Sequence, residues 1–159
     1  MVKSNKFLKV CRKCKAACCR MGGPDFTEAE MKKVLKAGHK NYFFEVRNRI
    51  YELKSKKGIC PYLKKDYSCE IHKIKPLMCR CWPVFPMVKH GRRIKKRDMI
   101  IECPITKLLT NEQIAKCRKE ANKIPDKLLY AALDFSTLSK SNAKLIKMRF
   151  DKFKKRELK

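Results

Sequence analysis

Cysteine spacing constrains this chain more than any other feature. The stretch CRKCKAACC, from Cys11 to Cys19, places four thiols within nine residues. Six more thiols follow, at Cys60, Cys69, Cys79, Cys81, Cys103 and Cys117. Cys-x-x-Cys pairs and adjacent Cys-Cys pairs suit metal-ligating loops and are awkward for local disulfides. We therefore expect most of these thiols to converge on metal, with the fold forming around that site.

The rest of the sequence favours a cytoplasmic protein with reduced thiols. Disulfide frameworks belong mainly to secreted chains, which usually begin with a signal peptide. The N-terminal MVKSNKFLKV is basic and lacks the apolar run of such a peptide. No later segment approaches the roughly 18 consecutive apolar residues of a membrane-spanning helix. We therefore expect no membrane span.

The charge balance points to an anionic partner. The net charge is +27, from 42 Lys and Arg against 15 Asp and Glu. Such an excess attracts polyanions and speeds encounters with them, so RNA, the ribosome and acidic proteins are the expected partner classes. The alternative is a Lys-rich surface that serves solubility and ion-pair networks.

The N-terminal half predicts a mixture of loops, one clear helix and one ambiguous segment. Residues 1–10 are expected to be a basic lead-in, and Cys11 to Cys19 a tight ligating loop that runs into a helical turn. The segment DFTEAEMKKVLKAG predicts a helix, with a capping box of Thr27 and Glu30 and with Gly38 closing its end. Residues 41–53 fit either a helix or a strand.

The remaining segments predict two hairpins followed by helices. Residues 59–72 are expected to form two short strands joined at 64–66, and residues 82–103 a second hairpin around 90–91. Between them, Pro76 is expected to start a helical turn that carries Cys79. Helices are predicted at 109–124, with Thr110 as cap, from Pro125 onward, and at 143–153. The sequence thus predicts a small α+β domain at 1–138, metal-stapled, with short β-hairpins and surrounding helices, and a basic helical tail at 139–159.

The order of these motifs resembles the YkgJ-type cysteine-cluster family, which is described as zinc- or iron-chelating. The family's opening Cys-x-x-Cys and Cys-Cys, and its Thr-x-x-Glu helix start, correspond to Cys11, Cys14, Cys18, Cys19, Thr27 and Glu30. Its Cys-Pro-x-Leu corresponds to Cys60, Pro61 and Leu63. Its motif Cys-x-Ile-Tyr-x-x-Arg-Pro-x-x-Cys-Arg-x-Phe-Pro and its closing Cys-Pro correspond to Cys69, Ile71, His72, Lys75, Pro76, Cys79, Arg80, Trp82, Pro83, Cys103 and Pro104.

This chain departs from the family pattern at three places. His72 stands for Tyr, Lys75 for Arg and Trp82 for Phe. The change at Lys75 matters most, because Lys lacks the planar bidentate fork of Arg. Any role of that Arg in orienting a carboxylate or a backbone turn is therefore weakened here.

The resemblance implies a set of eight ligands: Cys11, Cys14, Cys18, Cys19, Cys60, Cys69, Cys79 and Cys103. Eight thiolates suffice for two sites of four, and both zinc and an iron–sulfur cluster of the 4Fe-4S type take four. Soft thiolates select either, so both cofactors stay open. Neighbouring side chains diverge, so Cys18 and Cys19 serve two sites or one of them is free. Cys81 and Cys117 are expected to be buried small apolar residues, with Cys81 and His72 as candidate additional ligands.

A second candidate site is the tip of the second predicted hairpin. The segment KHGRRIKKR, residues 89–97, has six Lys or Arg and no acidic residue. Contact with phosphate needs only positive charge and reach. The predicted anion-binding residues are Lys89, Arg92, Arg93, Lys95, Lys96 and Arg97.

Three functions fit these features. The first is an accessory or redox protein that binds metal or an iron–sulfur cluster through cysteine and meets an anionic partner through its basic surface. The second is implied by the resemblance, since one branch of the family includes flagellin lysine N-methylases: a cluster-dependent protein lysine N-methylase-like enzyme. The chain is short for that activity and shows no separate S-adenosylmethionine signature. The third is an RNA- or ribosome-associated zinc protein.

Overall fold

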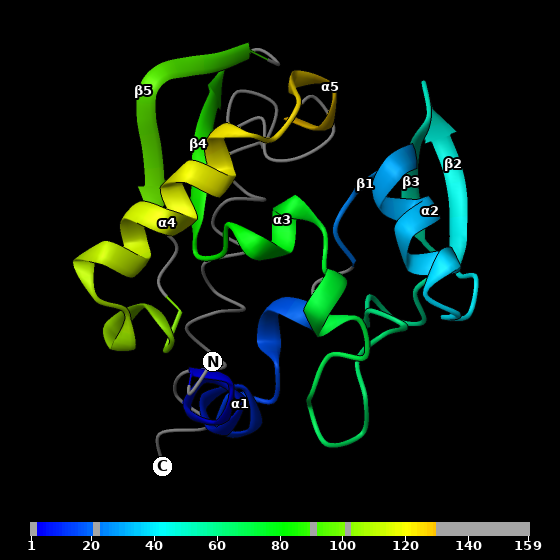
Figure 1. Ribbon diagram of the computed structural model, residues 1–159, viewed down its shortest axis with the longest axis horizontal. Coiled ribbons are helices and arrows are strands. Elements are labelled where there is room, and N and C mark those ends of the chain that lie inside the picture. Colours follow the sequence, from blue (N-terminus) through cyan, green and yellow to red (C-terminus); the bar gives the residue numbers. More distant parts are fainter. Residues whose placement is uncertain (1–2, 21–22, 90–91, 101–102, 130–159) are drawn as a thin grey trace.

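A short central helix separates two packed groups of secondary structure in the computed structural model, which describes residues 3–20, 23–89, 92–100 and 103–129. This central helix is α3 (Leu77–Arg80), and Figure 1 shows one group on each side of it. The first group comprises α2 (Glu28–Lys36), β1 (Phe26–Thr27), β2 (Phe43–Arg47) and β3 (Ile50–Leu53). The second comprises β4 (Val84–Lys89), β5 (Arg92–Ile100), α4 (Asn111–Asn122) and α5 (Asp126–Leu129). The predicted α+β class is therefore confirmed.

The basic lead-in, for which the sequence predicted no secondary structure, is a helix. Helix α1 (Lys3–Lys13) reaches into the cysteine stretch and carries Cys11. Its partly buried residues Phe7, Val10 and Cys11 follow the three- and four-residue spacing of one helix face, whereas Lys6 and Lys9 are exposed. The sequence predicts this apolar helix face only when Cys11 is counted as an apolar residue. The helix ends at Lys13, and the chain then turns at residues 15 and 16, which adopt positive φ angles of 50° and 47°.

The capping predictions were correct for α2 and α4. At α2, the Thr27 hydroxyl accepts the Glu30 N–H at 3.3 Å, and the Glu30 carboxylate accepts the Thr27 N–H at 2.9 Å. Gly38 follows with a φ of +84°, as predicted for the residue that closes this helix. At α4, Thr110 and Gln113 form the same reciprocal pair.

The ambiguous segment at 41–53 is a β-hairpin, so the strand alternative was the correct one. Its turn residues Asn48 and Arg49 both have positive φ angles, 43° and 57°, which suits the tight turn of a twisted two-strand ribbon. β3 lies in the centre of the sheet order β1-β3-β2 and pairs antiparallel with both neighbours. Phe43 and Leu53 pair across this hairpin, and both are buried.

Residues 59–72 do not form the predicted β-hairpin. This segment has only isolated bridges, Lys56 to Ile59 and Leu63 to Cys69, and continues into the 3-10 helix η2 (His72–Ile74). The Asp66 carboxylate accepts both the backbone N–H and the hydroxyl of Ser68. Local side-chain bonds of this kind compete with a strand ladder, and they hold this segment as a turn.

The second predicted hairpin is confirmed as β4–β5. The strands pair antiparallel from Val84–Ile100 to Lys89–Arg92, with an irregularity between Pro86 and Val88. α3 follows Pro76 and carries Cys79, also as predicted. α5 begins at Asp126 as expected, but the rest of that helix, the predicted helix at 143–153 and the tail at 139–159 lie outside the described residues. The division into domain and tail stays a prediction.

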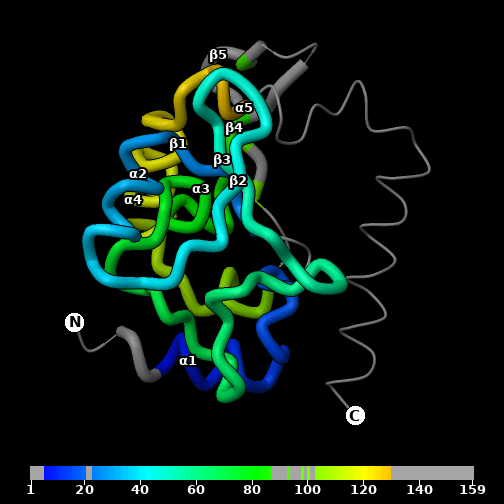
Figure 2. Tube along the Cα trace, turned by 90° about the vertical axis from the view of Figure 1, so that its right-hand side faces the viewer, coloured from blue at the N-terminus to red at the C-terminus, as the bar shows by residue number. Residues whose placement is uncertain are grey.

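Two hydrophobic clusters fill the two groups of elements. One contains Phe26, Val34, Phe43, Leu53, Cys60, Tyr62 and Ile71, all buried. The other contains Ile50, Cys81, Val84, Phe85, Ala121, Ile124, Leu128 and Leu129. Figure 2 shows α1 toward one end of the molecule and the β4–β5 hairpin toward the other. Among the helices described, none combines the length and apolarity needed to cross a membrane.

Candidate metal centre

The eight predicted ligand cysteines come from five short pieces of the fold. α1 and the turn after it supply Cys11 and Cys14, and the 3-10 helix η1 (Ala17–Arg20) supplies Cys18 and Cys19. The loop after β3 supplies Cys60 and Cys69, α3 supplies Cys79, and Cys103 precedes the 3-10 helix η3 (Thr106–Leu108). All ten cysteines of the chain are free thiols.

Backbone hydrogen bonds fix these pieces against one another. The N–H of Ala16 binds the Cys11 carbonyl at 2.8 Å, and the N–H of Cys19 binds the Ala16 carbonyl at 3.0 Å. The N–H of Cys60 then binds the Cys19 carbonyl at 2.8 Å. This last bond places two predicted ligands from distant parts of the chain side by side.

One group of thiols consists of Cys11, Cys14, Cys18 and Cys103. Burial raises the pKa of Cys11 to about 12, and the nearby thiols of this group add to the rise. Burial also raises the pKa of Cys103, with smaller increases from Cys18 and Cys14. The four thiols therefore lie within electrostatic range of each other, because like charges at close distance oppose each other's ionisation.

A second group consists of Cys19, Cys60, Cys69 and Cys79. Burial raises the pKa of Cys79, and the Cys69, Cys18 and Cys60 thiols raise it further. Burial raises the pKa of Cys69 as well, with a contribution from Cys60. Cys19, Cys60 and Cys69 also lie in or against the hydrophobic cluster around Phe26.

Cys18 and Cys19 join the two groups. The interaction between their neighbouring thiols lowers the pKa of Cys18 to about 7 and raises the pKa of Cys19. Beyond that pair, Cys19 interacts with Cys79 and Cys60, which belong to the second group. The thiols of adjacent residues therefore stand at the boundary between two sets.

Lys75 is the cation that the cysteine groups share, and sequence reasoning did not identify it as part of the site. Burial is the largest cause of the raised pKa at Cys11, Cys69 and Cys79, and at each of them the Lys75 ammonium opposes the rise. The signal in the sequence was its position four residues before Cys79, next to Pro76. The planar bidentate fork of Arg is not needed to oppose the rise in these pKa values, because the point charge of the Lys75 ammonium suffices.

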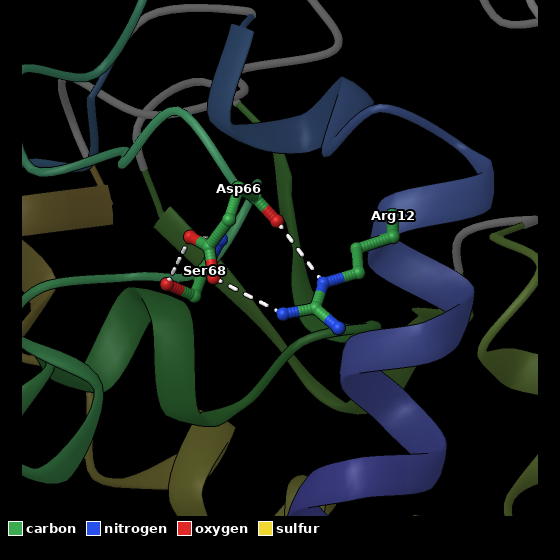
Figure 3. A network of polar contacts seen from close by, with 3 residues as sticks. All are labelled: Arg12, Asp66 and Ser68. Carbon is green, nitrogen blue, oxygen red and sulfur yellow. Dashed lines mark hydrogen bonds and ion pairs between the residues drawn. The ribbon is translucent and has the colours of Figure 1, made fainter.

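An ion pair ties α1 to the loop that carries Cys69. Arg12 donates from Nη2 to Asp66 Oδ2 at 3.1 Å and from Nε to the Asp66 carbonyl at 3.2 Å. Ser68 donates to the same carboxylate, and Figure 3 shows how the three residues meet. The Ser68 hydroxyl and N–H, followed by Arg12, lower the pKa of Asp66 to about 2.

The two remaining cysteines lie in the other hydrophobic cluster. Cys81 is fully buried there, and its thiol donates to the Met78 carbonyl at 3.4 Å. Cys117 packs against the same cluster and donates to the Trp82 carbonyl at 3.5 Å. Cys81 is buried as expected, whereas Cys117 is only partly buried. His72 is exposed on η2. The additional-ligand assignments of Cys81 and His72 stay predictions.

Within residues 3–20, 23–89, 92–100 and 103–129, no three Cys, His, Asp or Glu side chains already stand in the arrangement of a metal site. The donor types nevertheless suit a soft metal, because all the predicted ligands are free cysteine thiols. The assignment of individual ligands stays a prediction.

The predicted anion site at 89–97 is described only in part. Among its six basic residues, the side chain of Arg93 is described. It donates to the carbonyls of Ile124 at 2.6 Å and Ala121 at 3.2 Å, and it pairs with Asp126 at 3.7 Å. Arg93 therefore joins β5 to the end of α4 and the start of α5. The side chains of Lys89, Arg92, Lys95, Lys96 and Arg97 lie outside the described set, and their role stays a prediction.

Comparison with known proteins identifies the region that contains the thiol groups. Residues 10–104 match a family with the short name CxxCxxCC and the description "Putative zinc- or iron-chelating domain". The match spans all eight predicted ligands and supports metal binding by this cysteine-rich chain. No curated protein and no solved structure matches the chain.

Proposed function

Because the chain belongs to the CxxCxxCC family of zinc- or iron-chelating domains, we propose that it holds two metal sites of four cysteine thiolates each. The first site uses Cys11, Cys14, Cys18 and Cys103. The second uses Cys19, Cys60, Cys69 and Cys79. Two sets of interactions between thiols support this proposal. Beyond the effect of burial, Cys14 and Cys103 raise the pKa of Cys11, and Cys69 and Cys60 raise the pKa of Cys79. Cys18 interacts with members of both sets.

We assign iron–sulfur clusters of the 4Fe-4S type to these sites. Four thiolates are the usual ligand set of such a cluster, and a cluster with its thiolates carries net negative charge. The ammonium of Lys75 lies within range of both groups, and the whole chain carries a net charge of +27. Both features stabilise a negative cluster. The protein is then an accessory or redox protein whose functional group is the iron of its clusters.

The first experiment measures iron and acid-labile sulfide per chain on protein purified without oxygen. Iron and sulfide in equal amounts are expected. Zinc without sulfide would contradict the cluster and leave two thiolate zinc sites. Cys11→Ser and Cys19→Ser are each expected to lose about half of the metal, because they belong to different sites. Complete loss from both variants contradicts the division into two sites.

We further propose that the protein binds the phosphate backbone of RNA through a basic face built from α1 and the loop after β3. Two acid-free stretches form it: the chain carries seven basic residues and no acid before Asp25, and five basic residues and no acid between Glu52 and Asp66. The exposed members include Lys6, Lys9, Lys13, Lys54, Lys56, Lys57, Lys64 and Lys65. Phosphate contacts from Lys need only charge and reach, which suits RNA without sequence selectivity.

The fold brings these two stretches together. The pair Arg12–Asp66 links them, and the Figure 1 view shows the loop beside α1. The same pair neutralises Asp66, which is the acid nearest to this face in sequence. The apolar side of α1 is partly buried and carries Cys11, so it is not available to enter a lipid surface. These features favour a polyanion in water over a membrane.

Salt-dependent binding to a single-stranded RNA oligonucleotide tests this surface. The double variant Lys9→Gln and Lys64→Gln is expected to lower the slope of log affinity against log salt by about 1 to 2, since each lost phosphate contact removes roughly 0.7 for single strands. The matched control is the double variant Lys32→Gln and Lys116→Gln. These two residues are exposed on α2 and α4, and each pairs with an acidic residue of its own helix. An equal change in both double variants contradicts the proposed face.

A further inference from the structure

The indole N–H of Trp82 is a buried hydrogen-bond donor that has no acceptor among the described residues. Its Nε1 atom is inaccessible to solvent, and no acceptor in the described chain meets it with hydrogen-bond geometry. A buried N–H without an acceptor is rare in proteins, because desolvation of the donor is not repaid by a bond. Trp82 is also the only tryptophan of the chain. Within the described residues, this donor is therefore left without a bonded acceptor.

The polar group within range of this N–H is the thiol of Cys103. Burial raises the pKa of Cys103, and the next cause, which acts in the opposite direction, is hydrogen bonding from the Trp82 side chain. Donor and thiol are therefore close neighbours, although full bond geometry is not reached. A neutral thiol is a weak acceptor, whereas a thiolate accepts strongly.

Both partners are held in place by their surroundings. The Trp82 ring stands edge-on to Phe85, with ring centroids 5.6 Å apart and planes at 80°. The Trp82 carbonyl accepts the Cys117 thiol. On the other side, the Thr106 N–H binds the Cys103 carbonyl at 2.8 Å, and Thr106 Oγ1 accepts the Cys103 N–H at 3.4 Å. These contacts hold the backbone of Cys103 and the ring of Trp82.

We propose that Trp82 is a positioning residue that donates its indole N–H to the metal-bound thiolate of Cys103. The inference rests on the proposed first metal site and adds a donor from outside the ligand set. Phe, the residue of the family pattern at this place, carries no N–H, so the donor is a feature of this chain. Donors to ligand sulfur orient the ligand and stabilise the more negative, reduced state of a redox site.

The single indole makes the bond directly observable. In protein labelled with ¹⁵N and loaded with ¹¹³Cd, the indole N–H gives one resonance, and scalar coupling between its proton and ¹¹³Cd reports a hydrogen bond to a cadmium-bound sulfur. Coupling is expected in the wild type and in Cys19→Ser, which alters only the second site. Cadmium bound to both sites without this coupling overturns the role of Trp82 and leaves the metal sites standing. A chain that binds no cadmium overturns both.

A second readout separates this role from simple packing. Trp82→Phe keeps an aromatic ring and removes the N–H, so the reduction potential of one site is expected to shift to a more negative value while metal content stays unchanged. Phe85→Leu disturbs the same ring contact but leaves the donor in place. It is expected to leave both potentials unchanged. Equal shifts in the two variants mean that packing alone is responsible, and unchanged potential in Trp82→Phe also overturns the proposal.

Discussion

The carboxylate of Glu30 binds the backbone N–H of Leu77 at 2.8 Å through Oε1, while its Oε2 completes the capping box of α2. Leu77 is the first residue of α3, where the backbone N–H has no partner within the helix. The preceding residue, Pro76, provides no side-chain cap. One carboxylate thus caps two helices, and the second of them carries Cys79.

Removal of the Glu30 carboxylate should therefore cost more than removal of an ordinary cap. Glu30→Ala leaves the Leu77 N–H without its acceptor and opens the capping box, so we expect a loss of about 2 kcal/mol or more in the free energy of unfolding. Urea unfolding at constant metal content measures the change.

Gln113→Ala is the matched control for that variant. Gln113 occupies the same capping-box position on α4, and its bonds are to Thr110 alone. We expect it to lose about 1 kcal/mol. Equal losses in the two variants would show that the bond to Leu77 contributes nothing.

Arg93 should act as a structural residue rather than as a surface charge. Arg93→Met removes three hydrogen bonds to the end of α4 and the segment after it, so a loss of about 1–3 kcal/mol in unfolding free energy is expected. Asp126→Asn removes only an ion pair of 3.7 Å with an 82% exposed carboxylate, and less than about 0.5 kcal/mol is expected. Thermal unfolding of both variants measures the difference, and the reverse ranking contradicts this assignment.

Asp25 should make stability fall as the pH rises from about 4 to about 6. Burial, and then the neighbouring Glu52, raise the pKa of this carboxyl from 3.8 to about 6. Between these values the folded chain binds more protons than the unfolded chain, so the free energy of unfolding decreases with pH. The contribution is complete below about pH 4 and lost above about pH 6.

Asp25→Asn removes this titration. We expect the variant to be more stable than the wild type by about 1 to 2 kcal/mol at pH 7.5, and by less at pH 5. The quantity to measure is the difference between variant and wild type at each pH, since metal binding contributes equally to both. A difference that does not change with pH contradicts the raised pKa.

Cysteine substitutions should separate ligands from buried residues. Cys79→Ser is expected to lose about half of the metal and to unfold more easily, because it disrupts the second site and metal binding is coupled to folding in small thiolate domains. Cys117→Ser, at a position that donates only to the Trp82 carbonyl in the described chain, is expected to keep both. Metal analysis and circular dichroism measure the two outcomes. Full metal content in Cys79→Ser rules out its assignment as a ligand.

Local features of this fold could be read from the sequence, and non-local ones could not. The caps at Thr27 and Thr110 depend on residues three positions away, so their patterns were sufficient. The turn at Asp66 was read as a hairpin because its side-chain bonds to Ser68 leave no trace in hydrophobic alternation. The bond from Glu30 to Leu77 joins residues 47 positions apart, which no local pattern encodes.

The candidate site shows the same limit. Cysteine spacing and the family pattern predicted a set of eight ligands, and that set stays a prediction. The sequence left open how adjacent Cys18 and Cys19 are used, because that depends on thiols from distant parts of the chain, such as Cys79 and Cys103. Trp82 and Lys75 were read as departures from a pattern, and their relation to the thiols appears only in three dimensions.

The meeting of the two thiol groups at Cys18 and Cys19 also sets an order of assembly. All ligands proposed for the second site fall between Cys18 and Cys103 in the chain, so one site is nested within the loop that the other closes. A growing polypeptide completes the inner set first and lacks the outer set until Cys103 leaves the ribosome. Filling the inner site shortens the effective loop that the outer site must close. Metal content of stalled nascent chains, with and without Cys103, measures this order.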